Sequence, residues 1–559
     1  MSDRSKTGGE YVYEALVDAG LDLLVGLPGT QTLPLDRVVA DRDEMRYVMA
    51  RHETAVPHVA WAYYEVSGTP AATLTVPGPG ETNAMHGLKN ALEDSVPLVH
   101  VTGDAHPDER GKGPIHEIDP HTYDDVVKEN VVVESRRDLP AAVERGIERA
   151  LTPPYGPVRL GIPSRFLGEA FAAPTATVEP ERVTRENGPA FDAAADLLAD
   201  AERPLLYVGG GVRRSADGTR AVAALADELE ATVLASYKGK GVFPEDDPRF
   251  LGVGGSHLPA SARRAVAAAD AVVALGADLD GLATDHWTLP LDDGLVHVTL
   301  DPDALGAAYE PAVGIVDDAA TAARALGDRL AGRPAPDRWD PAAVGAAARE
   351  AYRDHLEGEG LFGAGESGVH TPAVLETVRE TVPDDAVVTT DVGGFRLWTL
   401  QAVPVYEPDA FVTAGSWAGM GIGLPAAVGA KLARPERPVV CLSGDGGFLM
   451  CTQELATAAE EDLAIVLVVS NDADYGIISK SPEIHREGSD HAFAWESPDY
   501  ATVAEGFGWT GASVADADAL AGALRAALGR DGPTLIDVSV PADEPSAPDA
   551  ADFETDLSF

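Results

Sequence analysis

The sequence predicts an α/β protein with three doubly wound domains, each a parallel β-sheet covered by helices on both faces. Short apolar runs alternate with amphipathic helical stretches along most of the chain, which is the pattern of parallel sheets. The length of 559 residues is far more than one hydrophobic core can hold. Loop-like stretches interrupt the alternation twice, so we expect domains over residues 1–175, 188–332 and 366–543, with an acidic tail over 544–559.

The first segment contains the clearest alternation of helices and strands. We expect helices over residues 9–19, 54–65 and 82–93, and strands over 23–26, 46–49, 71–76, 98–102 and 158–162. Strands separated by helical stretches imply a parallel sheet with helices on both faces. Residues 171–189 are interpreted as a linker to the next domain.

The second and third segments repeat this alternation. In the second, an apolar strand runs into the glycine turn at 209–211, an alanine-rich helix follows to about Leu229, and strands are expected at 271–276 and 296–300. The stretch from Gly327 to about Ser367 is interpreted as a long connection with some helix. The third is expected to hold helices over 371–381, 423–432 and 452–460 and strands over 386–390, 439–443, 465–470 and 534–540, and its tail after Ala542 to be loose.

The composition indicates a high-salt environment rather than a charged binding partner. The formal net charge is −49, from 91 acidic against 42 basic residues, which argues against binding to nucleic acid or to anionic membranes. We interpret the acidic surface as an adaptation to high salt, where screening removes the self-repulsion. No window has the roughly 18 apolar residues of a membrane span and the N-terminus lacks signal-peptide character, so a soluble, cytoplasmic protein is expected. The two cysteines, Cys441 and Cys451, are expected to be buried thiols.

Acidic side chains follow two predicted strands of the third segment. Asp445 comes directly after one strand, and Asp472 follows the next strand 27 residues later, which is about one crossover. Ligands bind at the carboxyl ends of parallel strands in open α/β sheets. Mg²⁺ prefers oxygen ligands and often bridges to phosphate, so Asp445 and Asp472, with a carbonyl near Asp474, are predicted metal ligands.

Two glycines next to Asp445 are suited to holding phosphate groups. Gly446 and Gly447 have no side chains, so their backbone N–H groups can approach a diphosphate at the start of the following helix. Taken alone, Gly-Asp-Gly is also compatible with an ordinary turn. With the later Asn471-Asp472, however, the segment resembles the thiamine diphosphate signature, a Gly-Asp-Gly followed after a crossover by Asn-Asn or Asn-Asp.

Arg51-His52-Glu53, between a predicted strand and a helix, extends this resemblance to the acetolactate synthase family. Without the resemblance, a glutamate at a helix start is explained by the helix dipole. The resemblance implies that Glu53 hydrogen-bonds N1′ of the cofactor's aminopyrimidine and promotes the imino tautomer. His116-Glu117 falls where the family has Gln-Glu, which makes His116 a second catalytic candidate.

Further stretches match the family in the same order along the chain. Residues 76–83 resemble Ser-Gly-Pro-Gly-Ala-Thr-Asn, and Asp94 to Val99 continue the match. Residues 418–427 resemble the stretch whose bulky residue, here Met420, separates the two cofactor rings. By the resemblance the cofactor-binding residues are Pro28, Gly29, Gly78, Asn83, Gly393, Gly394, Phe395, Ala418, Met420, Gly446 and Gly447.

The resemblance also names the three domains and an assembly. They correspond to a pyrimidine-binding, a central and a diphosphate-binding domain. In this family Glu53 of one chain would meet the cofactor held by Asp445 of another, so a homodimer or homotetramer is implied.

The chain departs from the family at two places. Where anabolic members present arginines to a non-redox FAD, residues 276–282 read Gly-Ala-Asp-Leu-Asp-Gly-Leu, so we expect no stoichiometric FAD, although Lys238, Lys240 and His257 retain parts of the pattern. In the acceptor pocket Ile115 replaces Phe and Ser481 replaces Trp, while Gly394-Phe395 replaces Gln-His.

The leading expectation is decarboxylation of a 2-oxo acid such as pyruvate with carboligation to a 2-acetolactate-type product. The first alternative is a simple 2-oxo acid decarboxylase that releases an aldehyde, and the second is a non-catalytic protein that kept the fold. A nicotinamide-dependent dehydrogenase is disfavoured because Gly209-Gly210-Gly211 lacks GxGxxG spacing.

Overall fold

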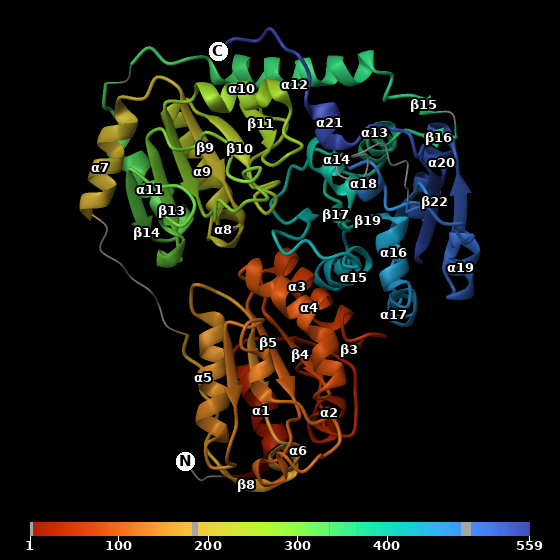
Figure 1. Ribbon diagram of the computed structural model, residues 1–559. Helices are drawn as coiled ribbons and strands as arrows, with labels where there is room; N and C mark the ends of the chain where they lie inside the picture. Colours follow the sequence, from red (N-terminus) through yellow and green to blue (C-terminus); the bar gives the residue numbers. More distant parts are fainter. Residues whose placement is uncertain (1–3, 181–187, 335, 366, 482–492) are drawn as a thin grey trace. The chain divides into compact units, whose positions relative to one another are not determined.

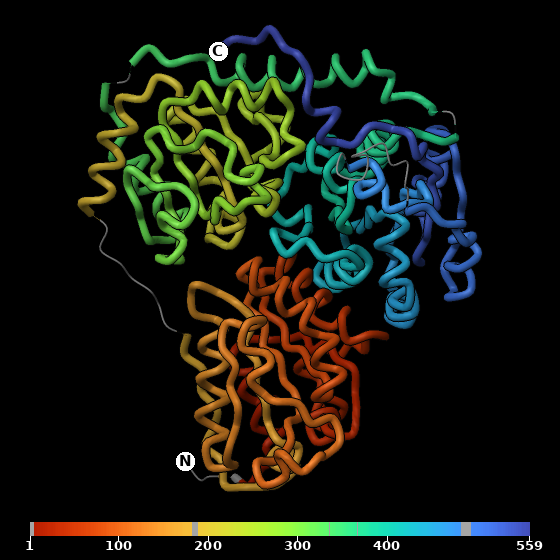
Figure 2. Tube along the Cα trace, in the orientation of Figure 1, coloured from red at the N-terminus to blue at the C-terminus, as the bar shows by residue number. Residues whose placement is uncertain are grey.

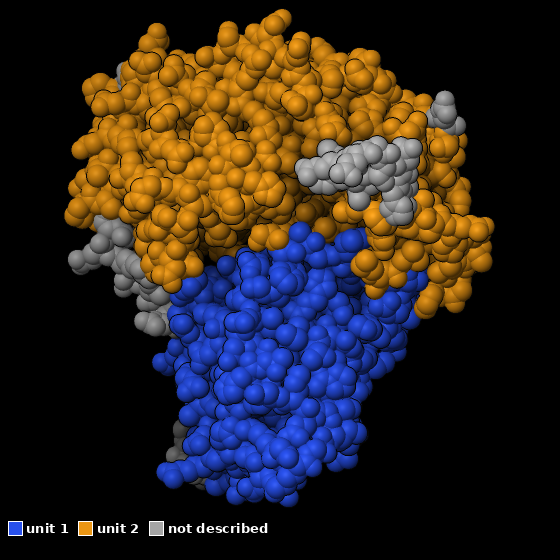
Figure 3. Space-filling model, viewed as in Figure 1, with its two compact units in different colours: residues 1–183, 417–436, 451–465 blue, residues 184–416, 437–450, 466–559 orange. Residues whose placement is uncertain are grey.

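The computed structural model describes residues 4–180, 188–334, 336–365, 367–481 and 493–559. The chain forms two compact units, coloured separately in Figure 3. Unit 1 comprises residues 1–183, 417–436 and 451–465, and unit 2 comprises residues 184–416, 437–450 and 466–559. The two inserted segments of unit 1 come from the predicted third domain, an arrangement that the sequence did not predict.

Unit 1 contains a six-stranded parallel sheet with the strand order β3-β2-β4-β5-β7-β6 (Figure 1). Its central strands are fully buried, as expected for a sheet covered on both faces. The strands are β2 (Leu23–Gly26), β3 (Arg46–Met49), β4 (Ala71–Thr75), β5 (Leu98–Thr102), β6 (Glu129–Val132) and β7 (Val158–Gly161). The helices are α1 (Gly8–Asp18), α2 (Leu33–Ala40), α3 (Ala55–Ser67), α4 (Pro79–Glu93), α5 (Leu139–Leu151) and α6 (Ser164–Gly168).

Unit 1 differs from the sequence prediction in several places: α2, α5, α6 and β6 were not predicted, and two predicted features have other bounds. Helix α4 begins at Pro79 rather than at Thr82, since a proline in the first turn loses no helical hydrogen bond. The predicted linker is wrong in its first residues: β8 (Ala170–Ala173) pairs antiparallel with β1 (Arg4–Thr7). Neither of these short strands has a hydrophobic pattern from which it could be predicted.

The segment inserted from the third domain packs on α3 of unit 1. Helix α15 (Gly423–Ala433) lies against α3, and a Cβ at Gly429 would collide with the carbonyl oxygen of Val59. Glycine and alanine on α15 therefore permit a close helix contact. Helix α17 (Glu454–Glu460) also belongs to unit 1, where Glu454 accepts hydrogen bonds from the Arg51 backbone N–H at 3.2 Å.

The central sheet of unit 2 has the parallel order β11-β10-β9-β12-β13-β14. Strands β9, β12 and β13 were predicted, whereas the four-residue strands β10, β11 and β14 were not. The bounds are β9 (Pro204–Val208), β10 (Thr232–Ala235), β11 (Phe250–Val253), β12 (Ala271–Leu275), β13 (Leu295–Thr299) and β14 (Val313–Val316). The helices are α7 (Gly188–Ala199), α8 (Gly210–Arg214), α9 (Gly218–Leu229), α10 (Ala260–Ala268) and α11 (Ala319–Leu330).

The second sheet of unit 2 has the order β18-β17-β19-β20-β22-β21. Its strands are β17 (Val387–Thr390), β18 (Phe411–Val412), β19 (Val439–Gly444), β20 (Ile465–Asn471), β21 (Thr510–Val514) and β22 (Thr534–Ser539). The helices are α13 (Thr371–Thr381), α14 (Gly394–Ala402), α16 (Asp445–Cys451), α18 (Gly476–Ser479), α19 (Tyr500–Gly506) and α20 (Ala517–Leu528). With the sheet of unit 1, these form the three parallel sheets that the sequence predicts.

The predicted connection and tail are more ordered than expected. The connection contains the 18-residue helix α12 (Pro341–Gly358) and a small hairpin of β15 (Ala364–Gly365) and β16 (Gly368–Val369). The loose tail is wrong, because it forms helix α21 (Ala547–Ala551) and then runs along α12 (Figure 2). There the ring of Phe553 stacks on His355 with centroids 4.6 Å apart. None of the helices in the described ranges combines the length and apolarity that a membrane crossing requires.

Candidate active site

The predicted residues of unit 1 gather at the carboxyl ends of four adjacent strands. Pro28 and Gly29 follow β2, Glu53 follows β3, Gly78 follows β4, and His116 lies on the loop after β5. A Cβ at Gly29 would collide with Val76, which follows β4, so the ends of β2 and β4 are in direct contact. Parallel pairing thus brings together residues that are far apart in the sequence.

Glu53 is held by the first turns of α4. The Asn83 side-chain amide donates a hydrogen bond to Glu53 Oε2 at 3.0 Å, and the Thr54 hydroxyl donates to the Asn83 carbonyl at 3.1 Å. A Cβ at Gly80 would lie 3.2 Å from Glu53 Oε1, so the helix start passes close to the carboxylate. Among the described residues, the hydrogen bond to Glu53 involves Oε2 and not Oε1.

His116 is pressed against the start of α4. A Cβ at Gly78 would lie 2.6 Å from the His116 carbonyl oxygen, so only glycine permits this approach. Both residues have positive φ, +65° for Gly78 and +64° for His116. A non-glycine residue in this region is strained and is found most often at functional sites. Among the described residues, His116 Nδ1 is buried without a hydrogen-bond partner.

Ala418 and Met420 also lie in unit 1, next to α4. The Trp417 indole donates to His86 Nδ1 at 2.8 Å, which leaves the proton on His86 Nε2, 3.4 Å from the Met420 carbonyl oxygen. Gly419 packs so closely on His86 that no side chain fits there. Met420 is thereby held one turn along α4 from Asn83.

The predicted metal ligands meet in unit 2 at the ends of β19 and β20. Asp445 is buried; its Oδ1 accepts from the Gly446 N–H at 2.9 Å and its Oδ2 from the Ala473 N–H at 3.0 Å. Asp472 Oδ1 accepts from the Asp474 N–H at 3.2 Å. Asp474 itself accepts from the Ser479 hydroxyl at 2.7 Å, so its carboxylate is partly committed to the loop.

The two aspartates form an electrostatically costly pair. Burial and, as a smaller cause, the nearby Asp472 carboxylate together raise the pKa of Asp445 to about 7. Burial likewise raises the pKa of Asp472 to about 6, although Lys480 opposes this. A bound dication would remove the repulsion. Within the described ranges, no group of three or more His, Cys, Asp or Glu side chains converges as a metal site, so further oxygens must come from backbone, ligand or water.

Glycines beside the aspartates permit close packing of neighbouring side chains. A Cβ at Gly446 would lie 2.7 Å from the Tyr475 ring, and one at Gly447 would lie 2.7 Å from the Asp391 carboxyl carbon. Gly393, Gly394 and Phe395 start α14 after β17, and a Cβ at Gly394 would lie 3.7 Å from the Cβ of Ile477 on α18. The predicted cofactor-binding and metal-binding residues of unit 2 therefore lie at three neighbouring strand ends, those of β17, β19 and β20.

Sequence reasoning missed Asp391, which is buried directly after β17 and accepts from the Val392 N–H at 2.6 Å. The signal that identified Asp445, an acidic residue at the end of an apolar strand followed by two glycines nearby, is also present at residues 387–394.

In the central domain, the residues at the positions of the family's flavin site already interact with other groups of the protein. Lys238 Nζ donates to the Thr413 carbonyl at 2.9 Å, and Lys240 is buried in an ion pair with Glu245 at 2.6 Å. Asp280 Oδ1 accepts from the backbone N–H groups of Leu282 and Ala283. Two carboxylates and two committed lysines fit a diphosphate poorly.

Comparison with known proteins agrees with the three sheets. The description "Thiamine pyrophosphate enzyme, N-terminal TPP binding domain" matches residues 6–123, the central-domain description matches 191–326, and the C-terminal TPP binding domain description matches 391–538. The chain is 30% identical to the acetolactate synthase isozyme 2 large subunit of Escherichia coli over 95% of both chains. It is 32% identical to a probable 2-ketoarginine decarboxylase of Pseudomonas aeruginosa, over 96% of this chain and 94% of the relative. It is also 32% identical to the acetolactate synthase large subunit of Parasynechococcus marenigrum, over 96% and 87% respectively.

Proposed function

Because this chain belongs to the thiamine pyrophosphate enzyme family, we propose that it decarboxylates a 2-oxo acid such as pyruvate and joins the remaining fragment to a second oxo acid, giving a 2-acetolactate-type product. The observation that carries the proposal is the pair formed by buried Asp445 and half-buried Asp472 at neighbouring strand ends, beside Gly446 and Gly447. A scaffold protein has no use for two uncompensated carboxylates at such a position.

The residues of unit 2 fit Mg²⁺ and a diphosphate. Asp445 and Asp472 would supply carboxylate ligands, and a backbone carbonyl near Asp474 a third oxygen. Gly446 and Gly447 lie in the first turn of α16, where the Gly446 N–H orients the Asp445 carboxylate through its hydrogen bond to Oδ1. Burial raises the pKa of both aspartates, and a cation held between them would favour their charged forms.

The residues of unit 1 fit the pyrimidine end of the cofactor. When bound, thiamine diphosphate supplies the carbanion chemistry that decarboxylation requires. Glu53, oriented by Asn83, would share a proton with a ring nitrogen through its remaining carboxylate oxygen. His116 would hydrogen-bond the substrate, since its Nδ1 lacks a partner among the described side chains.

A simple decarboxylase that releases an aldehyde is the second candidate. It is favoured by the similarity to the probable 2-ketoarginine decarboxylase and by the two acceptor-pocket positions that lack an aromatic residue. Ile115 is 74% exposed, so nothing in this chain covers the position at which the family carries Phe.

We further propose a homodimer or homotetramer without bound FAD. Large apolar side chains are exposed beside the aspartate pair: Leu449 and Met450 on α16, and Ile477 and Ile478 on α18, at 43–49% exposure. Apolar side chains gathered next to a polar site indicate a surface that a partner covers. A second copy of this chain would bury them.

The experiment is a product analysis with the purified protein, thiamine diphosphate and Mg²⁺ in molar KCl. Pyruvate alone and pyruvate with 2-oxobutyrate are supplied, and acetohydroxy acids and acetaldehyde are both quantified. Acetohydroxy acids as the main product support the carboligase, whereas aldehyde alone supports the decarboxylase. Turnover of neither substrate, nor of a cationic 2-oxo acid such as 2-ketoarginine, refutes both. Light scattering on the same sample decides the assembly.

A further inference from the structure

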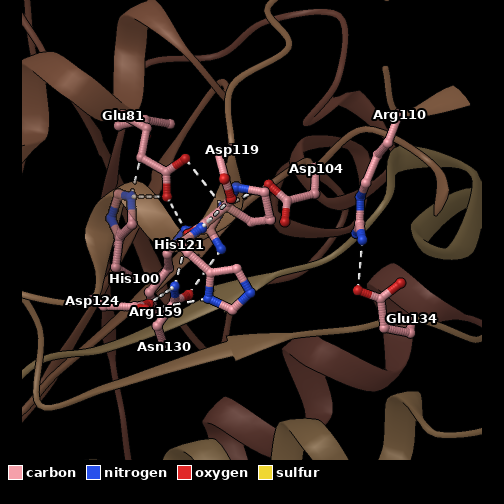
Figure 4. A network of polar contacts seen from close by, with 12 residues as sticks. Glu81, His100, Asp104, Arg110, Asp119, His121, Asp124, Asn130, Glu134 and Arg159 are labelled. Carbon is pink, nitrogen blue, oxygen red and sulfur yellow. Dashed lines mark hydrogen bonds and ion pairs between the residues drawn. The ribbon is translucent and has the colours of Figure 1, made fainter. Parts of the chain in front are cut away.

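A buried ionic cluster lies beneath the strand ends of unit 1, apart from the residues assigned above. Arg159 on β7 is fully buried, and its guanidinium donates to Glu81 through Nε and, at 3.2 Å, through Nη2. The same Nη2 donates to Asp104 Oδ1 at 2.5 Å, and Nη1 donates to Asn130 Oδ1 at 3.0 Å. Figure 4 shows Glu81, Asp104 and Asn130 converging on this one guanidinium.

The cluster touches both parts of the unit 1 site. Glu81 lies in the first turn of α4, between Gly80, which contacts Glu53, and Asn83, which hydrogen-bonds it. Glu81 also stands at the position of alanine in the family motif given above. The hydrogen bonds from Arg159 to Glu81 therefore fix the helical turn that orients Glu53.

The loop that carries His116 is held by the same arginine at both of its ends. Asp104 is near its start, just after β5. At its end the Tyr123 ring lies 4.6 Å from the guanidinium carbon, and Asn130 donates to the Pro120 carbonyl at 2.7 Å and to Asp124 at 2.6 Å. Between these anchors no residue from 105 to 119 is buried.

Burying these charges costs free energy of folding, so stability alone does not explain the cluster. Two carboxylates share one guanidinium, burial raises the pKa of Glu81 to about 7, and Asp104 Oδ2 has no hydrogen-bond partner among the described residues. Neighbouring His100 adds no positive charge, because burial and Arg159 lower its pKa to about 3. Room for the guanidinium exists only because residue 161 is glycine: a Cβ there would collide with Arg159 and Asp104. Replacing such a cluster by apolar residues is often neutral for stability.

We propose that Arg159 is a positioning residue, which ties the first turn of α4 and both ends of the His116 loop to one buried point and so holds Glu53 and His116 in place. The proposal rests on the proposed function for its catalytic part. Its anchoring part is independent, because it concerns only the order of the loop.

The test is a triple variant, Glu81→Ala/Asp104→Asn/Arg159→Met, which removes the cluster without leaving a buried charge. We expect it to fold, with kcat at least about 10-fold lower and KM changed by less than about threefold, since the groups are misplaced rather than removed. Trypsin cleavage after Arg110 and Lys112, both within the loop, should be at least about 10-fold faster, as followed by mass spectrometry. Arg159→Lys keeps the charge but loses the planar fork, so both effects should be intermediate.

The matched control is Lys240→Met/Glu245→Gln, which removes a fully buried ion pair in unit 2. Trypsin cleavage of the His116 loop should be unchanged in it. If the folded triple variant keeps kcat within twofold of the parent, or if cleavage of the loop is not accelerated, the proposal is overturned. If the parent itself has no thiamine-diphosphate-dependent turnover, the proposed function fails, while the cleavage rate still decides whether Arg159 anchors the loop.

Discussion

Replacement of Glu53 by glutamine separates the chemistry of this side chain from its shape. The carbonyl oxygen of glutamine can still accept from Asn83, now at 3.0 Å from Glu53 Oε2, so only the charge-assisted part of one hydrogen bond is lost. That loss is about 1 kcal/mol in stability. Because the side chain is only partly buried and the packing is unchanged, we expect the variant to fold.

The effect on turnover should be much larger. The amide group that replaces Oε1 cannot share a proton with a ring nitrogen, so we expect at least about a 100-fold loss in kcat, which corresponds to about 2.7 kcal/mol. Binding of Mg²⁺ and of the cofactor's diphosphate should change little, since the residues proposed to hold these two groups lie in unit 2.

Initial rates of 2-oxo acid consumption at saturating cofactor measure the loss, and calorimetric titration measures cofactor affinity. Glu169→Gln is the matched control, because it makes the same charge change at an exposed residue of unit 1 that pairs with Arg136 at 3.1 Å. Turnover of Glu53→Gln within about threefold of the parent would exclude Glu53 from the proton transfer. A loss of cofactor affinity equal to the loss in kcat would reassign it to binding.

Four further predictions concern the metal site, its protonation, salt and flavin. Asp445→Ala should lose thiamine diphosphate on dialysis against Mg²⁺ buffer, because a charged ligand to the anchoring ion is gone; retention of the cofactor would place the metal elsewhere. The folded pKa values of Asp445 (about 7) and Asp472 (about 6) exceed the ordinary 3.8, so protonation of these carboxylates stabilises the metal-free protein below about pH 4, and this contribution is lost as the pH rises to 7. The rise in Tm on adding Mg²⁺ should therefore be larger at pH 8 than at pH 5.5. Equal rises at the two pH values would contradict the pairing of the two aspartates at a metal. With a net charge of −49, Tm and dimerisation should increase steeply between dilute buffer and molar KCl, where the Debye length falls to about 3 Å, and a flat Tm would disprove the high-salt interpretation. The purified, active enzyme should show no flavin absorbance, and one equivalent of flavin per chain would prove the fit argument at Asp280 and Lys240 wrong.

Hydrophobic periodicity was sufficient to predict the three parallel sheets but not their short strands or the assignment of every helix to its unit. Strands β2, β5 and helix α13 have the predicted bounds, because each is a strongly patterned run between clear breakers. Short strands such as β10 and β11 carry no such pattern and form only because neighbouring strands offer hydrogen-bond partners. The assignment of α15 to unit 1 depends on the tight contact of Gly429 with α3, which no local signal announces.

The candidate site was predictable to the extent that it follows from strand ends. Asp445 and Asp472 follow neighbouring strands of one sheet, and Glu53 follows a strand of the unit 1 sheet after a short loop, so each parallel sheet brings its own residues to its carboxyl edge without further information. Asp391 obeys the same rule and was open to the same reasoning. The orientation of these side chains, such as the hydrogen bond from Asn83 to Glu53, depends on where α4 begins, and that is set by Pro79.

The ionic cluster around Arg159 marks the limit of such reasoning, for a physical reason. Arg159 is 78 residues from Glu81 and 55 from Asp104, and it interrupts the apolar strand Val158–Gly161, where a charged residue ordinarily faces solvent at a sheet edge. Only the pairing of β7 inside the sheet, with Arg159 opposite His100 and Asn130, turns its side chain toward α4 and away from solvent. A shift of β7 by one residue would place Leu160 there and leave Glu81 and Asp104 buried without a cation. The register of one interior strand thus decides whether the acidic first turn of α4 can lie where Glu53 needs it.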